Sequence, residues 1–253
     1  MIMVTRVGET GIFADENSFI TFLNSPFISH RELTAIDIFP NSRNFVEIRS
    51  PVSGKIIYHK VHIMRKNSMP EHVTIIDAGD VFVKLLHVEP YFVLNEKIEV
   101  GEILGKLYKS PYFRPWTDPH IHIELRPRND FLRARGGLKI NIDNCSPEGK
   151  FIPLDEYIQY DTYILRKIKP IKCGKFYGAG DFGIIDGGYP HYGYGLLIGT
   201  ENPVLMGERI GEILEDHIIK FYDKEIFLNG KKMRGMGFYV YLNENAFIKY
   251  IQL

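Results

Sequence analysis

The chain has 253 residues, and its 31 Lys and Arg balance its 31 Asp and Glu, so the formal net charge at pH 7 is zero. This balance excludes a global basic field of the kind that attracts nucleic acid, and it leaves no acidic tail. A chain of this length can bury a substantial core without disulfide support, and we expect two domains rather than one.

The aromatic and glycine content predicts a mostly β protein. The sequence contains 17 Phe, 15 Tyr and 23 Gly, which is typical of aromatic strands joined by glycine turns. Charged residues interrupt segment 1–16, so it does not resemble a cleavable secretory signal, and no later segment approaches ~18 consecutive apolar residues. We therefore expect no membrane span and a cytoplasmic protein, unless export uses another route.

The two cysteines, Cys145 and Cys173, stand in neither a CxxC motif nor a local pattern with histidine. This arrangement favours free thiols in a reducing compartment over a disulfide framework. We expect both thiols to be unpaired.

Short strands separated by turns are predicted for the first part of the chain. Residues 1–29 indicate a lead-in strand and a loop, and 35–39 an alternating strand in which Asp37 stands between two isoleucines. A carboxylate in such a place needs a partner, because burying an unpaired charge is costly. Further strands are expected at 45–49 and 54–58, a hairpin over 73–87, and short strands with glycine turns over 97–107.

The second part of the chain predicts a domain boundary near residue 160. Residues 126–160 look irregular, with a short helix at 154–158. The domains would then cover 1–160 and 161–253. The second is rich in Gly-Tyr clusters, has an alternating strand at 237–242, and fits a ligand-binding β module or packing against the first domain.

The segment 118–125, which follows a Pro- and aromatic-rich loop at 110–118, carries the clearest chemical signal. Its apolar and polar side chains alternate with the period of a strand, Ile121, Ile123 and Leu125 with His120, His122 and Glu124. Both imidazoles therefore point to one face, with their Cα atoms roughly 6.5–7 Å apart. One ring could hold a metal while the other contacts what the metal binds, although a bare His-x-His also fits an exposed sheet face.

Five polar residues at strand ends or on polar strand faces form the candidate site: His30, Asp37, His87, His120 and His122. Two imidazoles and one carboxylate, with a fourth position left to water, are a known catalytic zinc arrangement. Further histidines near that water can take its proton or stabilise an oxyanion. The remaining histidines are expected on the surface, namely His59, His62, His72, His191 and His217.

The order of these motifs resembles the lysostaphin-type zinc endopeptidases over about residues 28–126. The motifs are His30-x6-Asp37, the turn and strand Ser50 to Ile56, a strand ending in His87, Val100-Gly101-Glu102-Ile103-Leu104-Gly105, and Pro119-His120-Ile121-His122-Ile123-Glu124. The resemblance implies a duplicated hybrid motif fold, a β-sandwich or barrel-like peptidase domain. It also implies cleavage of peptide bonds, possible substrates being peptides of the bacterial cell-wall type.

Carried over position by position, the resemblance makes His30, Asp37 and His122 the ligands of one Zn²⁺ per chain. It gives His120 the role of positioning or deprotonating the attacking water, and His87 that of steadying the tetrahedral intermediate. Spacing alone does not separate His120 from His122 as the metal ligand.

Two departures from the family pattern leave other functions open. The aspartate follows the histidine by seven residues instead of the commoner four, and the bulky loop 110–118 could narrow or cover the cleft. The covering loop and the lack of an export signal favour the alternative, a non-catalytic metal-binding or ligand-binding module on the same fold. A phosphotransfer or carrier domain is a third reading by fold analogy alone, and the sequence lacks the carrier Met-Lys-Met tripeptide.

Overall fold

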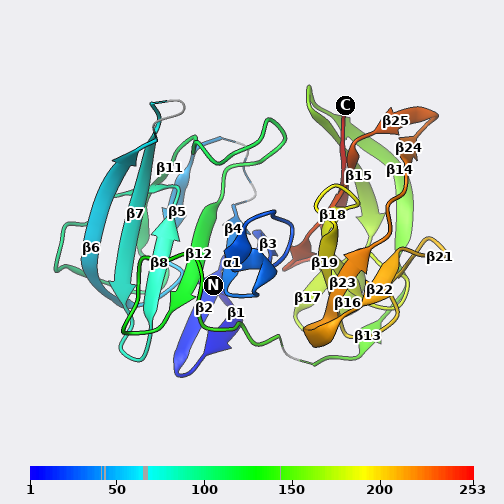
Figure 1. Ribbon diagram of the computed structural model, residues 1–253. Helices are drawn as coiled ribbons and strands as arrows, with labels where there is room; N and C mark the ends of the chain where they lie inside the picture. The colour runs from blue at the N-terminus through cyan, green and yellow to red at the C-terminus, as the bar shows by residue number, and fades with distance from the viewer. Residues whose placement is uncertain (41, 43, 65–67, 143) are drawn as a thin grey trace. The chain divides into compact units, whose positions relative to one another are not determined.

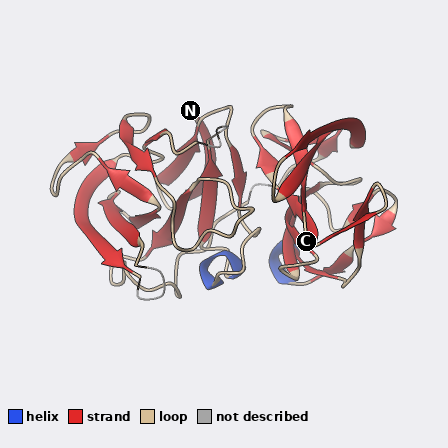
Figure 2. Ribbon diagram, turned by 90° about the horizontal axis from the view of Figure 1, so that it is seen from above, coloured by secondary structure: helices blue, strands red, loops and turns tan. Residues whose placement is uncertain are grey.

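The computed structural model describes residues 1–40, 42, 44–64, 68–142 and 144–253 (Figure 1). Strands and loops make up nearly all of the ribbon, which confirms the mostly β class (Figure 2). The chain forms two compact units. The first comprises Met1–Ser18 and Ile28–Asn141, and the second comprises Phe19–Phe27 and Ile142–Leu253.

The first unit is built on an antiparallel sheet with the strand order β10-β6-β7-β8-β12-β4 (Figure 1). The strand expected around His122 is present as β12, and both of its faces are buried: Ile121 and Ile123 are fully buried, and His122 and Glu124 are only 6% and 3% exposed. The hairpin expected over 73–87 is confirmed as β7 and β8. The bounds are Lys97–Ile98 (β10), Gly54–Ile63 (β6), Pro70–Asp77 (β7), Phe82–Leu86 (β8), Ile121–Arg126 (β12) and Ala35–Phe39 (β4).

Shorter elements complete the first unit. A hairpin joins β1 and β2, a second sheet has the order β5-β11-β9, and the four-residue helix α1 precedes β4. The bounds are Ile2–Val7 (β1), Thr10–Ala14 (β2), Ile28–Arg31 (α1), Glu47–Arg49 (β5), Val88–Pro90 (β9) and Ile103–Leu107 (β11).

The second unit is β-rich, and its strands form one sheet in the order β3-β27-β17-β16-β13 and a longer one in the order β14-β15-β28-β26-β18-β19-β23-β22. The bounds in the first are Phe19–Thr21 (β3), Val240–Tyr241 (β27), Phe176–Gly178 (β17), Ile171–Cys173 (β16) and Pro147–Glu148 (β13). Those in the second are Ile152–Gln159 (β14), Tyr163–Lys169 (β15), Ala246–Ile251 (β28), Gly235–Phe238 (β26), Ile184–Tyr189 (β18), Tyr194–Ile198 (β19), Ile218–Phe221 (β23) and Gly211–Ile213 (β22). Smaller elements are Val204–Leu205 (β20), Glu208–Arg209 (β21), Ile226–Leu228 (β24), Lys231–Met233 (β25) and the 3₁₀ turn Glu215–His217 (η1).

The helix expected at 154–158 is wrong, because these residues lie inside β14, which pairs with β15. A segment of five residues is too short to nucleate a helix by itself, whereas β15 offers a ladder of backbone partners. The acidic residues also find cations across the ladder, since Asp155 pairs with Arg166 and Glu156 with Lys167.

The segment 19–27 belongs to the second unit, although the sequence boundary near residue 160 would place it in the first domain. A buried carboxylate explains the difference. Asp186 on β18 accepts hydrogen bonds from the backbone N–H groups of Phe22 and Leu23, at 2.6 and 3.0 Å, and from the Thr21 hydroxyl. Because a buried charge without partners is costly, these donors tie the segment to β18.

The prediction of free thiols is wrong, since Cys145 and Cys173 form a disulfide with a Cα–Cα distance of 5.4 Å. The bond lies beside the pairing of Pro147 with Cys173 between β13 and β16. The disulfide joins Cys145, near the start of the segment Ile142–Leu253, to strand β16 of the second unit. Because the two thiols are joined, they give no support for a reducing compartment.

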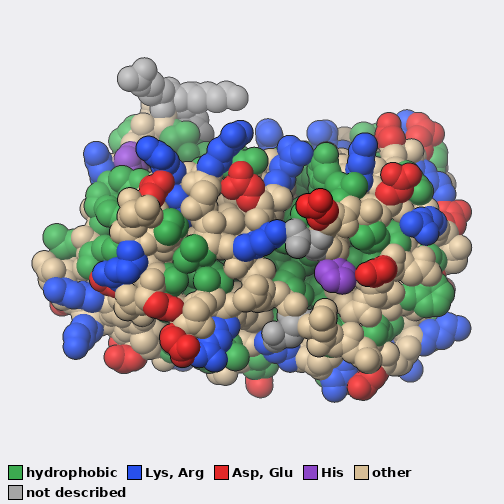
Figure 3. All heavy atoms as spheres, turned by 60° about the horizontal axis from the view of Figure 1, so that its bottom comes forward, with side chains coloured by type: hydrophobic (Ala, Val, Ile, Leu, Met, Phe, Trp, Pro, Cys, Tyr) green, Lys and Arg blue, Asp and Glu red, His purple; other side chains and the backbone are tan. Residues whose placement is uncertain are grey.

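Charged side chains of both signs are mixed over the face of the molecule seen in Figure 3. Among the described residues, none of the helices combines the length and the apolar content needed to cross a membrane.

Removal of the disulfide should destabilise the second unit. The bond closes a loop of 28 residues, and chain entropy assigns about 3–4 kcal/mol to a loop of that size. We expect the double variant Cys145→Ser/Cys173→Ser to unfold at a lower denaturant concentration, followed by tyrosine fluorescence and circular dichroism. Reductant should produce the same shift in the wild type and none in the double variant. An unchanged wild-type midpoint after reduction would contradict the assignment.

Candidate metal centre

The candidate centre is assembled by three segments of the first unit. β4 and β12 pair with Asp37 directly opposite His122, so their side chains emerge next to each other on one face of the sheet. His30 lies in α1, just before β4. The turn between α1 and β4 is stabilised because Thr34 donates its backbone N–H and its hydroxyl hydrogen to the carbonyl of Ser29. These contacts set His30 against the strand pair.

Three ligand atoms converge in this cluster. Asp37 Oδ1 lies 2.7 Å from His122 Nδ1 and 3.2 Å from His30 Nε2. The two imidazole nitrogens are 3.2 Å apart. The side chains are buried, with exposed fractions of 1% for His30, 5% for Asp37 and 6% for His122. Two nitrogens and one carboxylate oxygen in contact with one another are a donor set that fits Zn²⁺ and leaves a position for another ligand.

A second carboxylate holds the far side of the His122 ring. His122 Nε2 lies 3.2 Å from Glu124 Oε1, and the Lys84 ammonium donates to both oxygens of Glu124 at 3.1 and 3.2 Å. Lys84 stands opposite Glu124 on the neighbouring strand β8. Metal-binding histidines commonly donate their second ring N–H to a carboxylate, which fixes the tautomer and the ring orientation. Glu124 supplies this contact, and Lys84 compensates its buried charge.

The electrostatics of the centre follow from burial and from close opposite charges. Burial by itself would raise the pKa of Asp37, but the charges of His30 and His120 hold it well below its usual range. Burial opposes the charged form of His122, yet its hydrogen bonds with Asp37 and Glu124 raise the pKa to about 9. Burial is likewise outweighed at Glu124, where His122 lowers the pKa. Without a metal, an imidazolium therefore lies between two carboxylates at neutral pH.

His120 is a further imidazole that faces the carboxylate of Asp37. Its Nδ1 donates to the carbonyl of Asp118 at 2.9 Å, which leaves Nε2 as the ring atom nearest to Asp37 Oδ2, at 3.5 Å. Burial, only partly offset by Asp37, lowers the pKa of His120 to about 4. At neutral pH the ring is therefore uncharged, and Nε2 carries a lone pair that can accept a proton.

His87 is held by a third buried carboxylate, Glu71 of β7. Both oxygens of Glu71 lie 3.1 Å from His87 Nδ1, and the His87 backbone N–H donates to the same group at 3.0 Å. The hydroxyls of Tyr108 and Ser110 also donate to it, each at 2.5 Å. Burial would raise the pKa of Glu71, but its bonds with His87 and the hydroxyls lower the pKa to about 2. The ring of His87 lies 5.1 Å from that of His120, centroid to centroid.

Aromatic rings cover this cluster. Phe113, from the loop 110–118, stacks on His120 with a centroid distance of 4.7 Å and meets the edge of His87 at 4.9 Å. Phe39 of β4 contacts His120 at 4.7 Å as well. The loop foreseen as bulky therefore lies against the candidate centre, and His87 and His120 are only 4% and 6% exposed.

The structure brings together all five residues singled out from the sequence, namely His30, Asp37, His87, His120 and His122; their catalytic and ligand roles stay predictions. The carboxylates that position the rings, Glu71 and Glu124, escaped the sequence reasoning. Glu124 shares the two-residue period of His120 and His122, and that spacing was a usable signal. Glu71 had none, because it precedes His87 by sixteen residues and meets it only through the pairing of β7 with β8.

The other histidines divide into two groups. His59, His62 and His217 are exposed, as expected, and His72 is half-buried. His191 is half-buried too. Both of its ring nitrogens are inaccessible to solvent, and burial lowers its pKa to about 4.

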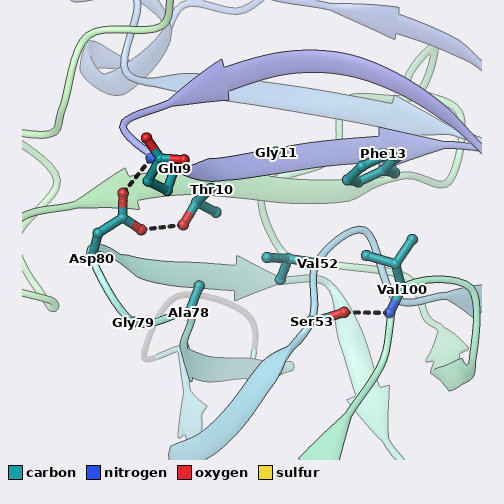
Figure 4. A pocket seen from close by; sticks show the side chains of 10 residues that line it. All are labelled: Glu9, Thr10, Gly11, Phe13, Val52, Ser53, Ala78, Gly79, Asp80 and Val100. Atoms are coloured by element: carbon teal, nitrogen blue, oxygen red, sulfur yellow. Dashed lines mark hydrogen bonds between the residues drawn. The ribbon is translucent and has the colours of Figure 1, made fainter.

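A pocket of about 420 Å³ lies at the other end of β8 from His87, around the turn between β7 and β8 (Figure 4). Asp80 accepts hydrogen bonds from the Glu9 backbone N–H and the Thr10 hydroxyl, and the Ser53 hydroxyl accepts one from the Val100 N–H. These polar groups thus form hydrogen bonds within the protein, and none of the five candidate residues lines the pocket.

Fold and site together define an all-β protein whose first unit carries a buried His–Asp–His cluster able to hold a metal ion. The chain belongs to the family described as "Domain of unknown function (DUF8155)": the model of its N-terminal domain matches residues 10–142, and that of its C-terminal domain matches residues 159–252. A search of curated proteins finds no match. The solution structure of lysostaphin aligns over 86% of this chain and 80% of that chain, with 14% identity and a TM-score of 0.30, which is too low to support an inference.

Metal affinity should depend on pH through His122. Its pKa is raised to about 9 in the metal-free protein, and a metal binds only the neutral ring, so the proton must leave first. We expect the apparent affinity for Zn²⁺ to rise about tenfold per pH unit from pH 6 to 8, and to level off above pH 9. Competition with a chelator of known pH dependence measures this. An affinity that stays constant from pH 6 to 8 would contradict the protonation assigned to His122.

Proposed function

We propose that the first unit is a zinc-dependent hydrolase of amide bonds, an endopeptidase or amidase that acts on peptides, including peptides of the cell-wall type. The observation that carries the proposal is the buried set His30, Asp37 and His122, whose donor atoms meet, with two further histidines packed against it. When bound there, Zn²⁺ would act as a Lewis acid and lower the pKa of a coordinated water to about 7.

The protein side chains would supply the proton transfers. His120 is neutral at physiological pH, and its Nε2 faces the cluster with a free lone pair, so it serves as the general base for the attacking water. His87 Nδ1–H donates a hydrogen bond to Glu71, so Nε2 is the ring nitrogen left to face a substrate. In this position the His87 ring would steady the oxyanion of the tetrahedral intermediate.

The choice of amide substrates rests on the motif order shared with the lysostaphin-type enzymes. The disulfide in the second unit bears on the compartment in which the protein works. Disulfides form and persist in oxidising environments. We therefore propose that the protein works outside a reducing compartment, in place of the cytoplasmic location expected from the sequence.

Metal content separates the roles of the two histidines on β12. We expect untagged protein, dialysed against metal-free buffer, to retain about one zinc per chain by elemental analysis. His122→Ala and Asp37→Ala should lose this zinc, because each removes a donor atom of the cluster. His120→Ala should keep it and should cleave peptides about 10²–10⁴-fold more slowly, since a general base contributes about that much.

His62→Ala, at an exposed histidine of β6, is the matched control and should keep both the zinc and the activity. Peptide pools read by mass spectrometry provide the activity measurement. If His120→Ala lost the zinc and His122→Ala kept it, the ligand assignment would be reversed. If the wild type held no zinc after reconstitution, the proposal would fail.

One observation favours the alternative function, a module that binds a peptide without cleaving it. Phe113 stacks on His120, and the Ser110 hydroxyl anchors the same loop to Glu71, so the loop 110–118 closes over the centre. A hydrolase requires this loop to move before a peptide reaches the cluster, whereas a binding module does not.

Phe113→Ala tests this reading by removing the covering ring. We expect the variant to keep its zinc, to release it severalfold faster to a chelator, and to cleave peptides at least as fast as the wild type. Arg114→Ala, on an exposed side chain of the same loop, should change neither rate. Peptide binding without cleavage in both the wild type and Phe113→Ala would favour the non-catalytic module.

A further inference from the structure

A second pair of imidazoles lies on the sheet of the first unit, away from the candidate centre. His59 is on β6 and His72 on β7, and the register pairs Val61 with His72 and His59 with Thr74. The two histidines are therefore diagonal neighbours on one face of the sheet. Because side chains alternate along a strand, Glu71 turns toward His87 while His72 turns to the other face.

The nitrogens of this pair stand at the separation of two ligands on one metal ion. His59 Nε2 lies 3.2 Å from His72 Nδ1. Two nitrogens at about 2.0–2.1 Å from a tetrahedral Zn²⁺ are roughly 3.4 Å apart. We propose that His59 and His72 form a second metal site, which chelates a divalent transition-metal ion such as Zn²⁺ or Cu²⁺ and leaves its other coordination positions to water.

The surroundings keep the two rings in place and accessible. Both strands are paired through this region, and the rings are stacked with an interplanar angle of 25°. The ring of Tyr108 lies 5.0 Å from that of His72, and the Tyr108 oxygen accepts a hydrogen bond from the His72 backbone N–H. His59 is exposed, so water can reach the ion. Little rearrangement is needed before binding, which lowers its cost.

The charge near the two imidazoles also suits a cation. The charge of Glu89 acts on His59, which places a carboxylate near the pair. Burial, followed by the influence of His72, lowers the pKa of His59. Neutral imidazoles select Zn²⁺, Cu²⁺ and Ni²⁺ over Mg²⁺ and Ca²⁺. With two protein donors, the site should be weaker than the three-donor centre.

Calorimetric titration with Zn²⁺ tests the proposal. We expect dialysed wild-type protein to bind one further ion. In His59→Ala and in His72→Ala this binding should weaken about 100-fold or more, because each variant leaves a single donor and loses chelation. The same loss is expected in a His122→Ala background, so the result does not depend on the candidate centre or on the proposed function.

His62→Ala is the matched control, because it removes an exposed histidine of the same strand whose side chain alternates to the other face. It should keep the additional ion. Mg²⁺ in place of Zn²⁺ should give no binding that depends on His59. The proposal is overturned if the wild type takes up no ion beyond the centre, or if His62→Ala weakens the binding as much as His59→Ala does.

Discussion

The ion pair between Asp37 and His122 is the interaction on which the first unit's functional architecture depends. Asp37 alternates with two core isoleucines, so its carboxylate points to the opposite face of β4, and that face is buried as well. Such a charge is tolerated only with close partners. The register of β4 and β12 places His122 directly opposite, at 2.7 Å. His30 then adds a further imidazole to the same oxygen.

The compensation of buried charge extends outward from this pair. His122 leads to Glu124 and then to Lys84, so carboxylates and cations alternate across three adjacent strands, β4, β12 and β8. Glu71 repeats the arrangement for His87, with hydroxyl donors taking the place of a cation. Networks of this kind hold rings in one orientation, because each member would be costly to leave unpaired. The candidate centre is thus ordered by the same bonds that make its burial possible.

The sequence predicted what depends on local pattern and missed what depends on pairing between distant strands. The alternation around His122 defined a strand, its buried face and the two imidazoles of the other face, and the hairpin of β7 and β8 followed from the same period. Glu71 could not be identified, because its role arises where the end of β7 meets the end of β8. The short helix at 154–158 was wrong since a partner strand outweighs a weak local preference. The disulfide also depends on strand pairing, which brings Cys145 and Cys173 together.

The segment 19–27 has partners that lie far along the chain. Thr21 and Asp186 are 165 residues apart, and the segment also pairs with β27, close to the end of the chain. During synthesis at about 5–20 residues per second, these early residues wait on the order of ten seconds or longer for their partners. The remaining residues of the first unit are complete at Asn141, well before that point. The segment 19–27 therefore stays without Asp186 and β27 until most of the second unit has been synthesised.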